Sequence, residues 1–327
     1  MRFLVGTVFL IGLAAGAPAQ QITGSTKLTV ATSAPPSAGA LLTGAVVTSD
    51  ASNGANSTIS VPVPSGWSLV WARGFEGNPA TSPSETITTG ASGGVTSNNA
   101  HSGGHALVGL YNAPDQTVGW NLHQGVLGSF NEVVISFWEY VDPGAMYPDS
   151  DFFYGGIVQP GVCGQVQDIQ YDMQNFSGQN SSNSATLVLV SEGYDTQATP
   201  CMGKYQYSTA KSLSMNGGSW RQFEIHILPS TSVGDSTSCL ASNNGSDCTG
   251  NGSSQFYVNG QQLISMTGVD INGTTNMANS IVGVGGVLTD LSGCGSWAST
   301  SCGGSRPGAM PPAPFNRYID DVIIVKR

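Results

Sequence analysis

The stretch from Trp220 to Leu228 alternates apolar and polar side chains, as a half-buried β-strand does. Gln222, Glu224 and His226 share the polar face of this expected strand. An amide, a carboxyl and an imidazole on one face can hydrogen-bond sugar hydroxyls or transfer protons. The pattern therefore predicts a polar groove on one side of the strand and protein core on the other.

A second group with chemical potential is the Asp320-Asp321 pair in the last stretch, Phe315 to Arg327. Val, Ile and Tyr dominate this stretch, which predicts a paired strand. Strict alternation would give two faces, namely Tyr318, Asp320, Val322 and Ile324 against Ile319, Asp321, Ile323 and Val325. Because an unpaired buried carboxylate is costly, we expect a partner for one Asp, either a cation or else Arg317, Arg73 or a turn amide.

The composition limits the class of protein. The 327 residues carry a formal net charge of −10, which argues against nucleic acid and anionic lipid as partners. Only 9% of the residues are charged and Gly numbers 44, which favours a secreted all-β protein with many turns over a helical one.

Residues 1–19 are typical of a secretory signal peptide. Arg2 precedes the apolar run Phe3 to Ala15, and Ala17-Pro18-Ala19 supplies a small-residue cleavage site. We therefore expect a secreted, periplasmic or extracellular protein with no membrane insertion after cleavage.

Six cysteines in an exported chain favour disulfides over thiols or metal ligands. Six permit fifteen pairings. The spacing favours Cys239 with Cys248 and Cys294 with Cys302, which leaves Cys163 to pair with Cys201.

Residues 20–64 are rich in Ser, Thr, Ala, Gly and Pro, and we interpret them as a low-complexity lead-in or linker with at most one strand at Lys27 to Ala31. Residues 65–327 contain many short strand patterns and no βαβ alternation. They predict an all-β fold, a single two-sheet antiparallel β-sandwich. Asn259-Gly260 predicts a type I′ hairpin turn.

Four pieces of the ordered region resemble the concanavalin A-like jelly rolls, the superfamily of laminin-G domains, glucanases and polysaccharide lyases. They are Phe75-Glu76-Gly77, Ser102 to Leu107, the strands Trp220 to Ile227 and Phe256 to Gly260, and Tyr318 to Val322. The resemblance implies a concave sheet on which Trp138, Tyr140, Gln222, Glu224 and His226 share one surface, with Asp172 able to join them. Aromatic rings beside polar groups suit sugars, because sugar CH faces stack on rings.

The resemblance also implies a structural calcium ion. In related jelly rolls an acidic residue near the first strand and an Asp of the last strand hold it, which here gives Glu76 and Asp320. Backbone carbonyls from the turn at Ser102 to His105 would complete the set, since calcium takes six to eight oxygen ligands.

A catalytic role is less well defined, and we assign no catalytic residue. The glucanases of this superfamily carry Glu-x-Asp-x-x-Glu on one strand, and this chain has no such run. A polysaccharide lyase needs a group that neutralises the uronate carboxylate and a base that removes the C5 proton. Gln222 suits the first role, and His226, Tyr171 or Tyr140 suits the second.

We therefore expect a secreted protein that binds a polysaccharide on its concave face and holds one calcium ion. The first alternative is a polysaccharide-cleaving enzyme, a lyase rather than a hydrolase, built on the same face. The second alternative is a structural or adhesive surface protein.

Overall fold

The computed structural model describes residues 39–76, 82–89, 93–111, 117–123, 125–145, 150–160, 166–174, 184–194, 203–207, 211–214, 217–229, 249–269, 281–290 and 314–327. These residues form β-strands joined by turns, and their only helical element is one 3₁₀ turn at Gly54–Asn56. None of them forms a helix long and apolar enough to cross a membrane. The predicted all-β class is confirmed.

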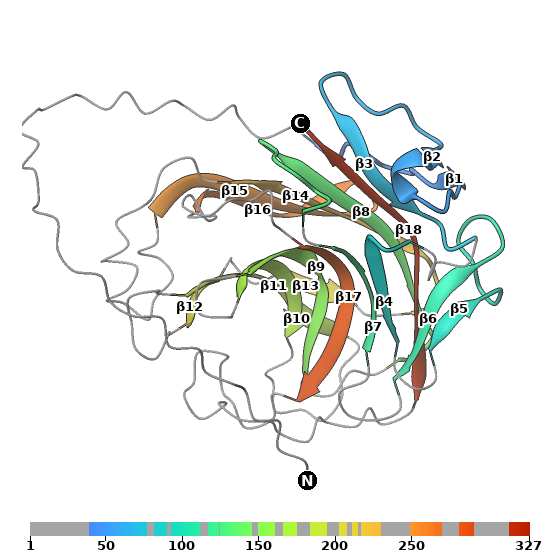
Figure 1. The fold of residues 1–327 in the computed structure, drawn as a ribbon. Coiled ribbons are helices and arrows are strands. Elements are labelled where there is room, and N and C mark those ends of the chain that lie inside the picture. The colour runs from blue at the N-terminus through green and yellow to red at the C-terminus, as the bar shows by residue number, and fades with distance from the viewer. Residues whose placement is uncertain are drawn as a thin grey trace, which may run out of the picture. The chain divides into compact units, whose positions relative to one another are not determined.

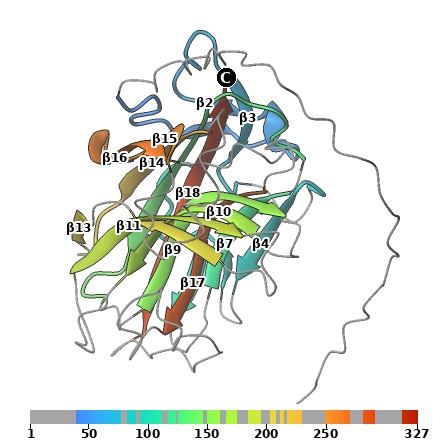
Figure 2. The same cartoon turned by 90° about the vertical axis from the view of Figure 1, so that its left-hand side faces the viewer.

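The strands form two large antiparallel sheets, and we name each after one of its strands (Figures 1 and 2). The strands of the β8 sheet are, in spatial order, β16 (Gln261–Val269), β15 (Thr249–Val258), β14 (Arg221–Leu228), β8 (Val133–Val141), β18 (Phe315–Lys326), β6 (Ala106–Tyr111) and β5 (Gly94–Thr96), with β3 (Ser68–Arg73) paired to β18. The turn between β15 and β16 has positive φ at Asn259 and Gly260, as a type I′ hairpin requires.

The second sheet, the β7 sheet, contains the strands that lie on the other side of the core. In spatial order they are β12 (Gly203–Tyr207), β11 (Ser184–Tyr194), β10 (Val166–Gln174), β9 (Ser150–Pro160), β17 (Ile281–Asp290), β7 (Thr117–Leu122) and β4 (Glu85–Thr89), with β13 (Lys211–Ser214) paired to β11.

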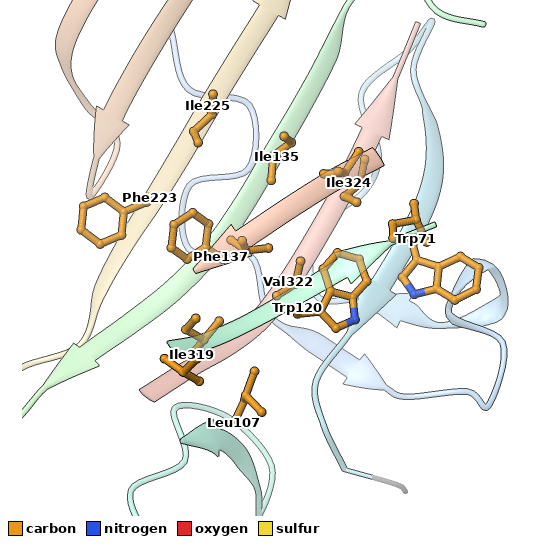
Figure 3. Packing of buried hydrophobic residues seen from close by; sticks show 14 of the residues in the cluster. Trp71, Leu107, Trp120, Ile135, Phe137, Phe223, Ile225, Ile319, Val322 and Ile324 are labelled. Atoms are coloured by element: carbon orange, nitrogen blue, oxygen red, sulfur yellow. The ribbon is translucent and has the colours of Figure 1, made fainter. Parts of the chain in front are cut away.

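The main core lies between the two sheets. Val118, Trp120 and Leu122 of β7 are fully buried in one cluster with Phe137 of β8 and Phe223 of β14. Figure 3 shows Trp120 close to Val322 and other inward side chains of β18. This packing confirms the predicted two-sheet sandwich, the architecture that the resemblance to concanavalin A-like jelly rolls implied.

A buried ion pair also joins the sheets. Arg73 of β3 binds Glu85 of β4 through Nε and Nη2, and its Nη1 lies 2.7 Å from Asp50 Oδ1. The indole N–H groups of Trp71 and Trp120 donate to Glu85 Oε2 at 3.0 and 2.8 Å. Every charge in this group therefore has partners, which burial requires.

Strand β18 does not alternate strictly, which corrects one expectation. Ile319 and Val322 both face the main core, so an extra residue is inserted between them. The pairing of β18 with β8 shifts between Asp320 and Ile323, and Asp321 has φ +48°. This β-bulge turns both aspartates toward the outer face of the sheet, the face that lies away from the main core.

A segment of the expected linker is folded onto this outer face. Residues 39–47, which we call the strap, place Leu42, Ala45 and Val47 in a second buried cluster with Val134 of β8. Strands β1 (Val47–Ser49) and β2 (Thr58–Ile59) follow. The compact unit thus extends N-terminal to residue 65, whereas residues 1–38 and all six cysteines lie outside the described residues.

The bulge makes a testable contribution to stability. Asp321 accepts hydrogen bonds from Val47 N and Ser102 Oγ and contacts His101 Nδ1. Asp321→Ala removes these acceptors and forces Ala into the left-handed region, so we expect the free energy of unfolding to fall by about 2–5 kcal/mol.

Asp321→Asn is the matched control, because Asn tolerates positive φ and keeps a carbonyl oxygen. We expect urea unfolding to show a clearly smaller loss for this variant. Equal losses for the two variants would contradict the role given to the bulge.

Candidate functional site

The polar face of β14 is buried, which corrects the expectation of an open groove. Gln222 and Glu224 are 2% exposed and His226 is 1% exposed. The strap covers them and is bound through its backbone. Leu41 N and Leu42 N donate to the two carboxylate oxygens of Glu224, at 2.6 and 2.9 Å.

Gln222 is held in the same way. Its Oε1 accepts from Gly44 N at 2.7 Å, and its Nε2 donates to Leu42 O at 2.6 Å and to Ser136 Oγ at 2.9 Å. The donors and acceptors expected for a sugar are thus used by the chain itself, and the face binds the strap.

His226 lies between two carboxylates. Its Nε2 is 2.5 Å from Glu224 Oε1, and its Nδ1 is 3.7 Å from Glu132 Oε1. Glu132 is in turn paired with Arg327 at 2.6 Å. Burial alone would lower the pKa of His226, but hydrogen bonding and charge from Glu132 and Glu224 outweigh it and raise this pKa above its ordinary value.

This raised pKa predicts a pH dependence of stability. The stabilisation is complete below the unfolded-state pKa of about 6.5 and is lost as pH rises through the higher folded-state pKa. Between pH 6 and pH 9 we therefore expect the native protein to lose more free energy of unfolding than the His226→Gln variant does.

Urea unfolding at the two pH values measures the difference. His105→Gln is the control, since His105 is a partly exposed histidine beside Glu76. Parallel pH profiles for the native protein and His226→Gln would rule out the carboxylate pairing as the source.

Trp138 and Tyr140 lie on the same outer face, but they differ in environment. Trp138 donates through Nε1 to Ala45 O at 2.9 Å and stacks on His101 at a centroid distance of 3.7 Å. Tyr140 is the next residue of β8 on the same face after Trp138, and it is partly exposed. Asp172 belongs to β10 of the opposite sheet, so it cannot share their surface, and its side chain lies outside the described set.

Asp320 and Glu76, the two expected calcium ligands, both bind the turn formed by residues 101–105. Asp320 Oδ2 accepts from His101 N and Ser102 N at 2.9 and 3.3 Å. Glu76 accepts from Gly104 N at 2.9 Å and from His105 N at 3.1 Å. Burial, and next the Asp321 carboxylate, raise the pKa of Asp320 to about 8.

This turn presents N–H donors to both carboxylates, where calcium would need carbonyl oxygens. Within the described part of the chain no group of three or more His, Cys, Asp or Glu residues has a metal-binding arrangement. The two carboxylates are thus bound by backbone N–H groups, and the calcium ion stays a prediction that the described residues do not test.

A different polar group lies on the outer face of the β7 sheet. Asn121 on β7 pairs with Thr86 on β4, and both point away from the core residues Trp120 and Leu122. His123 follows directly, and its Nε2 shares a 2.5 Å hydrogen bond with Thr86 Oγ1. Asn121 and His123 are partly exposed, and Thr86 is exposed.

On the β17 side of Asn121, the paired residues are glycines. Asn121 pairs with Gly283 of β17, which pairs with Gly156 of β9, and Gly119 pairs with Gly285. Glycine inside a strand is typical of places where a ligand or another backbone approaches closely. An amide, an imidazole and a hydroxyl thus meet at the end of a row of glycines, and the glycines themselves are buried.

Sequence analysis missed this group because strand β7 was not predicted. The alternation of Val118, Trp120 and Leu122 with smaller residues was the available signal. It would have placed Asn121 on the polar face, with His123 two residues later.

Comparisons with known proteins give only distant likeness. No protein-family model and no curated protein matches the chain. Among solved structures it is similar to an endo-β-1,4-glucuronan lyase from the fungus Trichoderma reesei, with 12% identity, a TM-score of 0.49, and coverage of 74% of this chain and 90% of that one. An alginate lyase from Aplysia kurodai has 10% identity and a TM-score of 0.49, with 80% and 100% coverage.

The likeness also extends to the binding domain of a botulinum neurotoxin of serotype D/C. There the identity is 11% and the TM-score 0.41, with 78% of this chain and 48% of that chain covered. With TM-scores below 0.5, this likeness carries no statement about the fold or the activity of this chain.

Proposed function

We propose that this protein is an exported polysaccharide-recognising protein and that it engages its glycan on the outer face of the β7 sheet, at Thr86, Asn121 and His123. The observation that carries the proposal is the meeting of these three partly or fully exposed groups on β4 and β7. Amide, imidazole and hydroxyl groups together offer the donors and acceptors that sugar hydroxyls need.

The neighbouring glycines support the same location. Gly283 pairs with Asn121, and Gly119 lies on the same strand, so no neighbouring side chain there competes with Asn121 and Thr86 for a ligand. The N-terminal signal pattern of residues 1–19 supports export to a compartment where polysaccharides are found.

A second candidate function is cleavage of a uronate polysaccharide by β-elimination. It is favoured by the position of His123 two residues after Asn121, on the same face. When His123 Nε2 donates to Thr86 Oγ1, Nδ1 keeps its lone pair and can act as the base. His123 then takes the C5 proton, the bond from C4 to the leaving oxygen breaks, and that oxygen takes up a proton from the protonated His123 or from water. The products are an unsaturated uronate and a new sugar end.

Asn121 has a separate part in this reaction. Its amide N–H group can donate to the uronate carboxylate, where negative charge builds up as the C5 proton leaves. The position two residues from His123, on a partly exposed face, allows both groups to reach one sugar unit.

The test is a turnover assay against neutral and uronate polysaccharides that follows ultraviolet absorbance of unsaturated uronates together with reducing ends. For a lyase we expect His123→Ala to lower turnover by about 100-fold or more, and Asn121→Ala by about 10-fold or more. His105→Ala is the matched control, because His105 is a partly exposed histidine in the turn near Glu76.

Glycan retention with no turnover would leave recognition as the function and remove the lyase candidate. Retention that is unchanged in both Asn121→Ala and His123→Ala, with native melting curves, would place the glycan elsewhere on the protein.

A further inference from the structure

A row of three aromatic residues crosses the outer face of the β8 sheet, next to the strap. Tyr318 of β18 pairs directly with Tyr140 of β8. Trp220 precedes Arg221, the first residue of β14, which pairs with Glu139. Trp220 therefore lies beside Tyr140, and the ring centroids of both neighbouring pairs are 5.7 Å apart. We call Tyr318, Tyr140 and Trp220 the aromatic row.

The polar atoms of this row have no partner among the described residues. Tyr140 Oη, Tyr318 Oη and Trp220 Nε1 make no hydrogen bond there. By contrast, the indoles of Trp71 and Trp138 each donate to a protein oxygen. Tyr140 and Trp220 are partly exposed, so their polar atoms are available to a ligand.

The hydroxyl of Tyr318 stays protonated. Burial, and next the charge of Asp142 and the neighbouring Tyr140, raise the pKa of Tyr318 above its ordinary value. It can therefore donate a hydrogen bond at neutral and at mildly alkaline pH.

A fixed carboxylate lies beside the row. Asp142 Oδ2 accepts from both the backbone N and the side-chain Nδ2 of Asn316, each at 2.8 Å, which fixes its orientation. The arginines of the adjacent strands, Arg221 and Arg317, are both bound to Glu139 on the inner face. The fixed charge next to the row is therefore negative.

One side of the row is also rigidly supported. The ring of His101 lies 5.3 Å from Trp220 and 3.7 Å from Trp138, and its Nδ1 is bonded to Asp321. The indole of Trp220 is thus backed by a ring that the β-bulge holds in place.

We propose that the aromatic row is a second glycan-binding surface, on the sheet opposite Asn121 and His123, and that it takes a neutral polysaccharide chain. The partly exposed rings of Tyr140 and Trp220 can stack on the CH faces of sugar units, while the O–H and N–H groups of the row and Asp142 bond their hydroxyls. The carboxylate disfavours an anionic chain. This surface does not depend on any activity at the β7 sheet.

The test is electrophoresis in native gels that contain hydroxyethyl cellulose, galactomannan or polygalacturonate. We expect at least one neutral polymer to retard the native protein. Any retardation by polygalacturonate should depend less on Trp220 and Tyr140. Trp220→Ala and Tyr140→Ala should each raise the apparent Kd for the neutral polymer by about tenfold, and Tyr140→Phe by less.

Two matched variants separate this surface from other effects. Trp67→Ala removes another partly exposed tryptophan, one that contacts Arg327, and should leave retardation unchanged. His105→Ala, in the turn near Glu76, should also leave it unchanged. The Trp220 and Tyr140 variants keep Thr86, Asn121 and His123 intact, so their loss of retardation reports this surface whether or not the proposed function holds.

The proposal is overturned if neither neutral polymer retards the native protein, or if the Trp220 and Tyr140 variants are retarded as strongly as the native protein while melting normally. If Trp220→Ala fails to fold, the test rests on Tyr140→Ala, which removes the ring, together with Tyr140→Phe, which keeps the ring and removes only the hydroxyl. An unchanged Kd for that variant, together with an unchanged Kd for Tyr140→Ala, overturns the proposal in the same way.

Discussion

Two adjacent carboxylates that have to be buried set the arrangement of the β8 sheet. Asp320 and Asp321 lie together at the β-bulge of β18, and both are fully buried. Their donors come from elsewhere in the chain: Val47 of the strap, and His101 and Ser102 of the turn before β6. Because unpaired buried carboxylates are expensive, the stability of this strand depends on both the strap and the turn.

The strap accounts for the polar residues of β14 that the sequence suggested as a sugar-binding site. Gln222, Glu224 and His226 have the side chains of a sugar site, yet they bind backbone amides of residues 41 to 44 and a second glutamate. Buried groups of this kind stabilise a fold when every donor and acceptor is paired. The partly exposed polar and aromatic groups at Asn121, His123, Tyr140 and Trp220 are therefore the better candidates for ligand contact.

Much of the fold could be predicted from the sequence, because alternation around Glu132 to Asp142 and Trp220 to Leu228 is a local signal. The strap could not be predicted, since it binds through backbone amides, which carry no sequence signature. The reversal of alternation at Asp321 depends on a left-handed backbone conformation. Asp tolerates this conformation, but its presence in a sequence does not predict it. Strand β7 was hidden by its central Gly119, which weakens a strand pattern.

The strap also limits where the chain can be shortened. Composition places the start of the ordered region near residue 65, but a polypeptide beginning there would lack Leu41, Leu42 and Gly44. Glu224 and Gln222 would lose these donors, and the apolar cluster around Val134 would be uncovered. Such a fragment would expose an apolar sheet face to other copies of itself. Its aggregation would then result from the missing strap and not from a weak core.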